Sequence, residues 1–274
     1  MAVTNNLGTK NNNKALSIQI NLSGLSFCVL DKDTTTVSHL DQIDFIETKN
    51  PESLLEALKE LFENTRILQD QFNEVTVIHQ NSWSTLVPNS IFNKEHSADY
   101  LKFNTKILAT DLLEVDAIDT LESKCVYVPF TNINNYIFER FGSFNFLHAT
   151  GLLVEKLSLL EKNNTSKNVY IHIAKHQFDL IIFGDGKLLF HNNFDFQTPE
   201  DFLYYILFTF EQLQINPELV TTKLLGEVSL DDENYKIAYK YIRHVSLFKP
   251  KFNLSFEQEN LQKQRYYNVL NAIS

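Results

Sequence analysis

Two short turns carry the residues whose types and positions come nearest to a chemical site. Asn21-Leu22-Ser23-Gly24 follows one apolar strand pattern, and His172-Ile173-Ala174-Lys175-His176 follows another. Such a turn binds phosphate when glycines let its backbone N–H groups approach the anion, and Mg²⁺ prefers carboxylate ligands beside it. In these two turns the polar side chains are instead the amide of Asn21, the hydroxyl of Ser23, the imidazoles of His172 and His176, and the ammonium group of Lys175. Neither turn has the residues that metal-assisted phosphate chemistry needs.

Other chemistry at these turns is also poorly supported. His172 and His176 have a spacing seen in metal sites, but it brings ligands together on a helix and not across the end of a strand. We therefore predict no metal site. Two-metal nucleases need clustered carboxylates, and Asn21 and His172 hold the first-strand positions instead. Lys175 and His176 have the charge and reach to contact an anion, so an altered anionic ligand stays open.

The first turn belongs to a run of three predicted strands within residues 16–46. Residues 16–20 alternate apolar and polar side chains, which is typical of a half-buried strand. Pro51 then marks the start of a helix, because its missing N–H costs nothing there. Leucines at spacings of three and four continue to Phe62, and residues 74–79 form the next predicted strand.

The segment 83–129 interrupts this alternation and predicts an inserted β-α-β-β piece. A helix from about 131, a strand from 144 and a helix to 160 complete a first lobe over 15–160. The polar run 161–168 is the predicted linker. The pattern restarts after it, with strands at 169–174, 178–183 and 188–196, a helix at 198–213, a strand at 222–225, a helix at 231–241 and a strand at 244–247.

The second lobe therefore spans 169–250. In 251–274, Ser255 and Gln258 suggest a capping box for a last helix to about Ile273, which we expect to pack back on the first lobe. The order βββαβαβ occurs in the second half, and with its insertion in the first. Two similar halves predict a two-lobed α/β molecule with a cleft between the lobes.

This arrangement resembles the actin-like ATPase superfamily, a duplication of an RNase H-like unit. With its insertion, the chain is similar to bacterial cell-division and pilus-assembly actin-like proteins. It also looks like an uncharacterised bacterial family, a domain of unknown function with this fold. Active members carry Asp-x-Gly-Thr/Ser where this chain has Asn21-Leu22-Ser23. They carry Asp-x-Gly-Gly-Gly-Thr-Thr-Asp where it has His172 to Asp179, and Gly-Gly where it has Gly226-Glu227.

The resemblance implies a cleft whose nucleotide-binding positions are degenerate: Asn21, Ser23, His172, Ala174, Lys175, His176 and Gly226. The chain has only 7 glycines. We therefore expect a non-catalytic pseudo-ATPase that serves as a binding or scaffold module for an unknown protein partner, with no cofactor. The alternative is a divergent phosphotransferase, or a protein binding a nucleotide or phospho-ligand in the cleft between the lobes.

The net charge and the composition of the chain disfavour some classes of binding partner and of cellular location. A net charge of −10 repels nucleic acids and anionic membranes on average, so neither is an expected partner. Cys28 and Cys125 lie in apolar strand patterns and predict buried free thiols, which suits a reducing compartment. Residues 1–14 predict a polar, disordered tail with no signal peptide, and no run is long enough to span a membrane. A cytoplasmic protein is expected.

Overall fold

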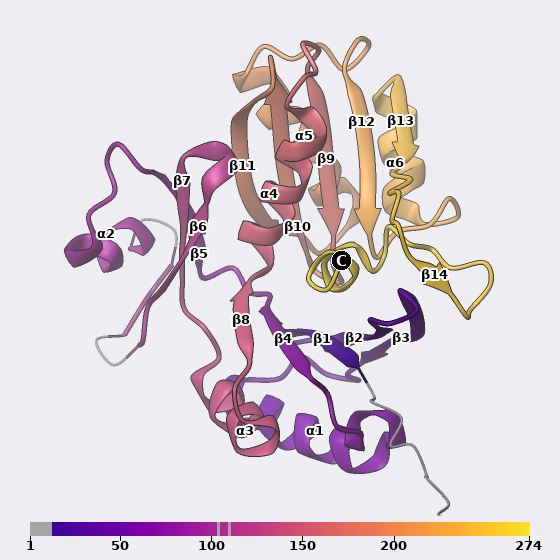
Figure 1. Cartoon of the computed structure of the whole chain (residues 1–274). Helices are drawn as coiled ribbons and strands as arrows, with labels where there is room; N and C mark the ends of the chain where they lie inside the picture. Colours follow the sequence, from indigo (N-terminus) through magenta and orange to yellow (C-terminus); the bar gives the residue numbers. More distant parts are fainter. Residues whose placement is uncertain (1–12, 103–104, 109–110) are drawn as a thin grey trace, which may run out of the picture.

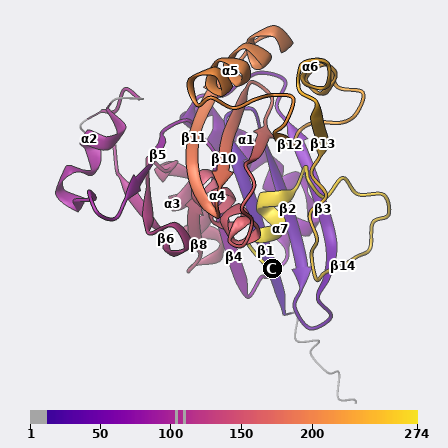
Figure 2. The same ribbon diagram turned by 90° about the horizontal axis from the view of Figure 1, so that it is seen from above.

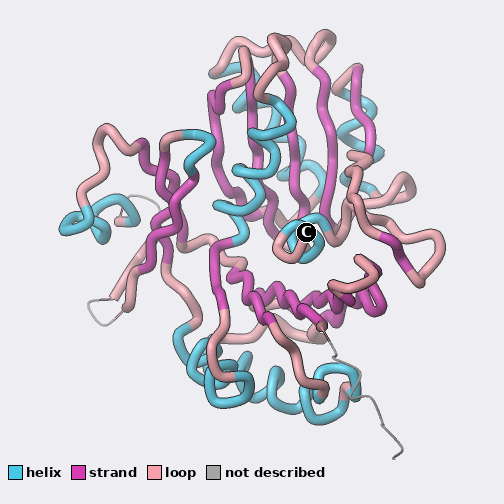
Figure 3. Tube along the Cα trace, viewed as in Figure 1, coloured by secondary structure: helices cyan, strands magenta, loops and turns pink. Residues whose placement is uncertain are grey.

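The computed structural model describes residues 13–102, 105–108 and 111–274, and places the strands in two large sheets and one small sheet. Figures 1 and 3 show the two large sheets one above the other, with helices outside and between them. Most of the 1–14 segment expected to be a disordered tail lies outside the described residues. Lys14 at its end already belongs to the first strand.

The first sheet is built from β1 (Lys14–Asn21), β2 (Gly24–Asp31), β3 (Thr36–Asp44), β4 (Glu74–His79), β8 (Asn145–His148) and β14 (Ser255–Phe256). Their order across the sheet is β14-β3-β2-β1-β4-β8. Helices α1 (Pro51–Asn64) and α3 (Thr131–Phe141) cover its outer face. α1 begins where the sequence predicts, with Asn50 and Ser53 forming a capping box and Pro51 in the first turn.

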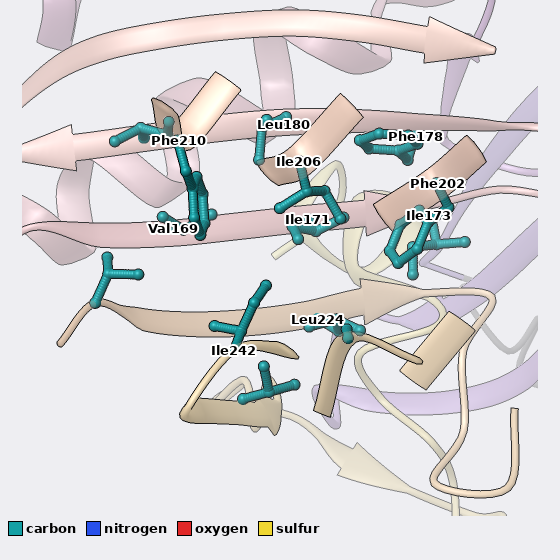
Figure 4. Close-up of a cluster of buried hydrophobic side chains, with 14 of the residues drawn as sticks. Val169, Ile171, Ile173, Phe178, Leu180, Phe202, Ile206, Phe210, Leu224 and Ile242 are labelled. Atoms are coloured by element: carbon teal, nitrogen blue, oxygen red, sulfur yellow. The ribbon is translucent and has the colours of Figure 1, made fainter. Parts of the chain in front are cut away.

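The second sheet is built from β9 (Asn168–Ile173), β10 (Gln177–Gly184), β11 (Lys187–Asp195), β12 (Thr221–Gly226) and β13 (His244–Leu247). Their order is β11-β10-β9-β12-β13. Helices α5 (Pro199–Gln212) and α6 (Glu233–Tyr241) cover its outer face. Figure 4 shows the core between them, where side chains such as Ile171 and Leu180 of the sheet meet Phe202 and Ile206 of α5.

The two large sheets share one plan. In each, three antiparallel strands come first, and two later strands run parallel to the first of them. The first strand, β1 or β9, therefore lies in the middle of its sheet, and its carboxyl end points at the other lobe. A duplicated α/β unit of this kind places the turns after β1 and β9 opposite each other.

The inserted segment forms a separate small sheet, which lies to the left of the second sheet in Figure 1. It consists of β5 (Ser84–Pro88), β6 (Glu114–Ile118) and β7 (Ser123–Tyr127), with helix α2 (Ser97–Leu101). Its inner face packs through Cys125 and Tyr127 on α4 (Ala149–Glu161). α4 lies between the lobes and presents Leu153, Val154 and Leu157 to the second sheet.

The linker expected over 161–168 is shorter than predicted. Glu161 is the last residue of α4, and Asn168 already belongs to β9. Glu161 is only 2% exposed and accepts hydrogen bonds from Tyr170 Oη (2.6 Å) and from Asn168 Nδ2 (2.9 Å). Only 162–167 connect the two elements as a surface turn. Glu161 and Asn168, the polar residues at the two ends of the predicted linker, belong to a buried hydrogen-bond network instead.

Removing the Tyr170 hydroxyl is expected to weaken the fold. In Tyr170→Phe, Glu161 Oε1 keeps only Lys223, whose Nζ is 3.9 Å away. An unsatisfied buried acceptor costs about 1–3 kcal/mol, so the urea midpoint should fall at an unchanged slope. Tyr205→Phe is the control, because the Tyr205 hydroxyl has no hydrogen bond to the described residues. Equal losses in both variants would contradict the role of Tyr170.

The long C-terminal helix predicted from Ser255 to Ile273 is wrong. Ser255 N–H donates to Thr35 O, and the backbone of Ser255–Phe256 pairs with the edge of β3. This pairing takes the Ser255 N–H that a capping box would need, and only a short helix α7 (Tyr267–Asn271) forms. α7 does pack on the first lobe, through Val269 and Leu270, but Tyr267 of the same helix contacts the second lobe. The C-terminus thus lies between the lobes (Figure 1).

Candidate functional site

The cleft between the lobes is formed by the β1–β2 turn, the β9–β10 turn and the end of β12. Six of the seven positions proposed from the sequence line one cavity there: Asn21, Ser23, His172, Ala174, Lys175 and Gly226. His176 lines a neighbouring cavity of about 130 Å³, which shares Asn21, Ser23 and Ala174 with the first one. The main cavity has a volume of only about 20 Å³. That is space for a water molecule or two.

The β1–β2 turn is closed by its own side chain. Asn21 Oδ1 accepts hydrogen bonds from the Ser23 N–H (2.8 Å) and from Ser23 Oγ (3.0 Å). This is an Asx turn, in which a side chain takes the place of an external acceptor. Asn21 Nδ2 donates to Gln80 Oε1 at 3.1 Å, which fixes the amide orientation. The Ser23 N–H is therefore already paired and is not offered to a ligand.

The β9–β10 turn is closed in a comparable way. Ala174 N–H donates to Gln177 O at 2.8 Å, within the turn itself. Lys175 Nζ reaches across the cleft and donates to Phe45 O of the first lobe at 3.3 Å. The cation that the sequence left available for an anion therefore connects the two lobes.

Gly226 is required by packing. Its φ is +84°, and a Cβ placed on it would lie 2.2 Å from Ile173 O. No side chain fits there, because β12 passes close to β9 at this point. The Gly226 N–H donates to Gln264 O at 3.0 Å. The C-terminal segment thus takes one of the amides at the positions that the sequence proposes for a nucleotide.

The C-terminal segment also connects the lobes through side chains. Arg265 Nε donates to Gln42 Oε1 at 2.8 Å, and Gln42 Nε2 donates to Glu227 Oε1 at 3.0 Å. This chain of contacts runs from the C-terminal segment to β3 of the first lobe and on to the end of β12 in the second. Burial, with the nearby Asp44 carboxylate, raises the pKa of Glu227, and Arg265 opposes that shift. The lobes are held together by direct bonds.

His172 lines the cleft cavity, and its imidazole also approaches a buried carboxylate. Its Nδ1 lies 3.5 Å from Asp179 Oδ2, and His191 Nε2 lies 3.1 Å from Asp179 Oδ1. Asn193 Nδ2 donates to the same Oδ1 at 3.3 Å. Burial alone would raise the pKa of Asp179, but the two imidazoles outweigh it and hold that pKa well below its usual range. His172 serves this cluster inside the second lobe.

A second buried polar cluster, which the sequence does not suggest, joins the inserted sheet to α4. Asp116 Oδ2 accepts from the His148 N–H at 2.8 Å, and Asp116 Oδ1 accepts from Tyr127 Oη at 3.1 Å. Burial raises the pKa of Asp116 to about 6, although both hydrogen bonds oppose it. Burial also lowers the pKa of His148 to about 3. His148 Nδ1 accepts from the Thr150 N–H and so caps α4.

The residues of the cleft do not fit a magnesium nucleotide. Its turns carry no carboxylate at the Asn21 or His172 positions, and the amides of Ser23, Ala174 and Gly226 donate within the chain. Ligand pockets typically enclose several hundred Å³, far more than this cavity provides. Over the described ranges, no three His, Cys, Asp or Glu side chains group so as to hold a metal ion.

A family profile described as "Protein of unknown function (DUF3822)" matches residues 4–245. The chain belongs to this family. No curated protein matches the sequence. As the resemblance implied, this is a family of unknown function.

Two solved structures of other proteins have a similar fold. A Bacteroides thetaiotaomicron protein with an actin-like ATPase fold and unknown function matches with a TM-score of 0.72 and 21% identity. The match covers 88% of this chain and 92% of that one. The PilM–PilN type IV pilus biogenesis complex matches with a TM-score of 0.58 and 12% identity, over 94% of this chain and 95% of that one. The predicted two-lobed actin-like ATPase fold is confirmed.

Sequence reasoning missed the residues that close the cleft. Gln42, Gln264 and Arg265 come from β3 and from the C-terminal segment, which the sequence placed in a helix on the first lobe. Nothing in their local pattern marks them, because each acts only through contacts far away in the sequence. The Asx turn of Asn21 is different, since Asn two residues before a turn amide is a local signal.

None of the helices in the described part of the chain is both long and apolar enough to cross a bilayer.

Proposed function

We propose that this family member is a non-catalytic protein of actin-like fold that binds another protein and does not use a nucleotide. One observation carries the proposal. Three amides at positions that would face a triphosphate, those of Ser23, Ala174 and Gly226, are bonded within the chain, and the C-terminal segment holds the last of these through Gln264. A nucleotide would have to break these bonds and separate the lobes before it could bind.

A protein partner is supported by the fold and by the charge. A structure of the same fold is that of PilM in complex with PilN, so such a fold is compatible with a protein ligand. The net charge of −10 disfavours nucleic acid. The cytoplasmic location expected from the sequence stays a prediction.

The alternative phospho-ligand function has less support. It rests on Lys175 and His176 acting together on an anion. Lys175 instead donates to Phe45 O, and His176 lines the neighbouring cavity. If the alternative were right, Lys175→Ala would weaken the binding of a phospho-ligand, and no such change is expected.

Isothermal titration with ATP and Mg²⁺ tests the proposal. No binding heat is expected up to about 1 mM nucleotide, where an ordinary ATPase site would saturate. An ATP-hydrolysing protein of the same fold serves as the positive control. Micromolar affinity for ATP in the unmodified chain would overturn the proposal.

A double variant tests whether the replaced side chains or the closure of the cleft prevents nucleotide binding. Asn21→Asp with Ser23→Gly restores the acid and the glycine of active members. It is still expected to bind no nucleotide, because the amides of Ala174 and Gly226 remain occupied. A gain of micromolar binding in this variant would show that closure of the cleft does not exclude nucleotide.

A further inference from the structure

The outer face of the second lobe leaves large apolar side chains in solvent. Tyr204 is 61% exposed and Phe208 is 47% exposed, and they lie one turn apart on α5. Their rings stack, with centroids 5.9 Å apart and an interplanar angle of 21°. They form a ridge that no described segment covers. This exposed apolar ridge is available for contact with another protein surface.

A groove lies beside the ridge. It runs between α5 and α6, which lie side by side on the outer face of the sheet (Figure 2), and its volume is about 520 Å³. Its apolar lining comes from both helices: Leu203, Tyr204, Leu207, Phe208, Ile237 and Tyr241. A face that holds a ridge next to a groove can pack against an identical face, which is what a two-fold interface requires.

Charged residues on the groove rim select one two-fold arrangement. Glu200 and Glu211 lie on the α5 side, and Lys240 lies on the α6 side. Within the described residues, none of the three forms an ion pair. α5 and α6 run in the same direction, because each leads into a strand parallel to β9. An axis parallel to the helices places α5 of one copy over α6 of the other, so that glutamate meets lysine.

An axis perpendicular to the helices would instead place α5 over α5, with its glutamates facing each other. We propose that this α5–α6 face joins two copies of the chain in a two-fold dimer, with α5 of each copy packed in the groove beside α6 of the other. The dimer goes beyond the proposed function, since it involves neither the cleft nor a different partner protein.

The exposed area sets the expected strength. A full aromatic side chain carries about 200 Å², so Tyr204, Phe208 and Tyr241 together expose roughly 300 Å². A standard interface buries about 800 Å² on each partner. The rings supply a good third of that, and the rest comes from the groove walls and rim. A dissociation constant in the micromolar range is expected.

Sedimentation equilibrium of the full chain from about 1 to about 200 µM tests the proposal, since that range brackets a micromolar constant. The dimer fraction should rise with concentration. Phe208→Asp should weaken the dimer at least about tenfold, because it places a charge in the interface, about 1.4 kcal/mol or more. Leu219→Asp is the control, since Leu219 is 75% exposed and lies outside the groove. A monomer throughout, or a dimer indifferent to Phe208→Asp, would overturn the proposal.

A charge reversal tests the arrangement of the helices. Lys240→Glu should weaken the dimer, because it faces the glutamates of the second copy. Adding Glu211→Lys to the same chain should restore it. These residues are exposed, so circular dichroism should show an unchanged fold. If Lys240→Glu leaves the dimer unchanged, the packing of α5 over α6 is wrong.

Discussion

Replacing Gly226 with alanine is expected to destabilise the protein by more than about 3 kcal/mol. The new Cβ would lie 2.2 Å from Ile173 O, and the residue would keep a φ of +84°. A positive φ alone costs a non-glycine residue about 1–3 kcal/mol, and overlap with the backbone of a packed strand adds to it. Urea unfolding followed by circular dichroism measures the loss. Failure to fold would be the extreme form of the same result.

Two other glycines provide matched controls for the two causes. Gly142 has a φ of +75° but nothing within 4 Å of its Cβ position, so Gly142→Ala measures the backbone cost alone. Gly24 has no positive φ in the left-handed range, but its Cβ would lie 2.5 Å from Ile43 O, so Gly24→Ala measures the overlap alone. If Gly226→Ala costs no more than Gly142→Ala, the close approach of β12 to β9 carries no energetic weight.

The close approach of Ile173 O explains why position 226 holds a glycine. In the actin-like resemblance, Gly226 stands where active members contact a nucleotide. In this chain its environment is set by Ile173 O and by Gln264, which accepts its N–H. A glycine here is required even with no ligand, so its presence does not indicate nucleotide binding.

Local patterns predicted most of the fold. The alternation in residues 16–20, Pro51 at the start of α1 and Thr198 before α5 each depend on neighbours within one turn or one strand. Such signals are readable from one sequence, because the residues that cause the structure lie next to each other. The repeated strand order added information that no single segment holds, and it identified the two lobes.

The C-terminal segment could not be predicted in the same way. Ser255 and Gln258 have the letters of a capping box, but the backbone of Ser255 pairs with β3 more than two hundred residues earlier in the chain. Tertiary hydrogen bonds outweighed a local preference worth about 1 kcal/mol. Arg265 and Gln264 then fall in the cleft, so the closure of the site followed from the same unpredicted contacts.

The degenerate turns were predictable by residue type, but the consequence for the cleft was not. The sequence shows that Asn21 and Ser23 replace an acid and a glycine. It does not show that Lys175 donates to Phe45 O or that Gln42 bridges Arg265 and Glu227. The sequence therefore does not distinguish an open cleft from a closed one, because the difference lies in the contacts between the two lobes.

Acidification from neutral pH to about pH 4 is expected to remove about 4 kcal/mol of stability. Burial lowers the pKa of His79 from 6.5 to about 4 and that of His148 to about 3. Between those values and 6.5 the unfolded chain binds protons that the folded chain does not. The free energy of unfolding therefore decreases by about 3 kcal/mol for each histidine as the pH is lowered from neutral to about 4. Asp116 acts in the opposite sense, because its pKa is raised from 3.8 to about 6 and the folded chain gains its proton first, returning about 2 kcal/mol.

Urea unfolding at a series of pH values measures this, and variants separate the groups. His79→Gln and His148→Gln should each flatten the pH dependence by about 3 kcal/mol, since glutamine does not titrate. Asp116→Asn should steepen it, because the opposing contribution is lost. A profile as steep in His148→Gln as in the unmodified chain would mean that the junction of β8, α4 and the inserted sheet admits a proton in the folded state. Burial of His148 and the hydrogen bond that its Nδ1 accepts from the Thr150 N–H would then not keep the ring unprotonated.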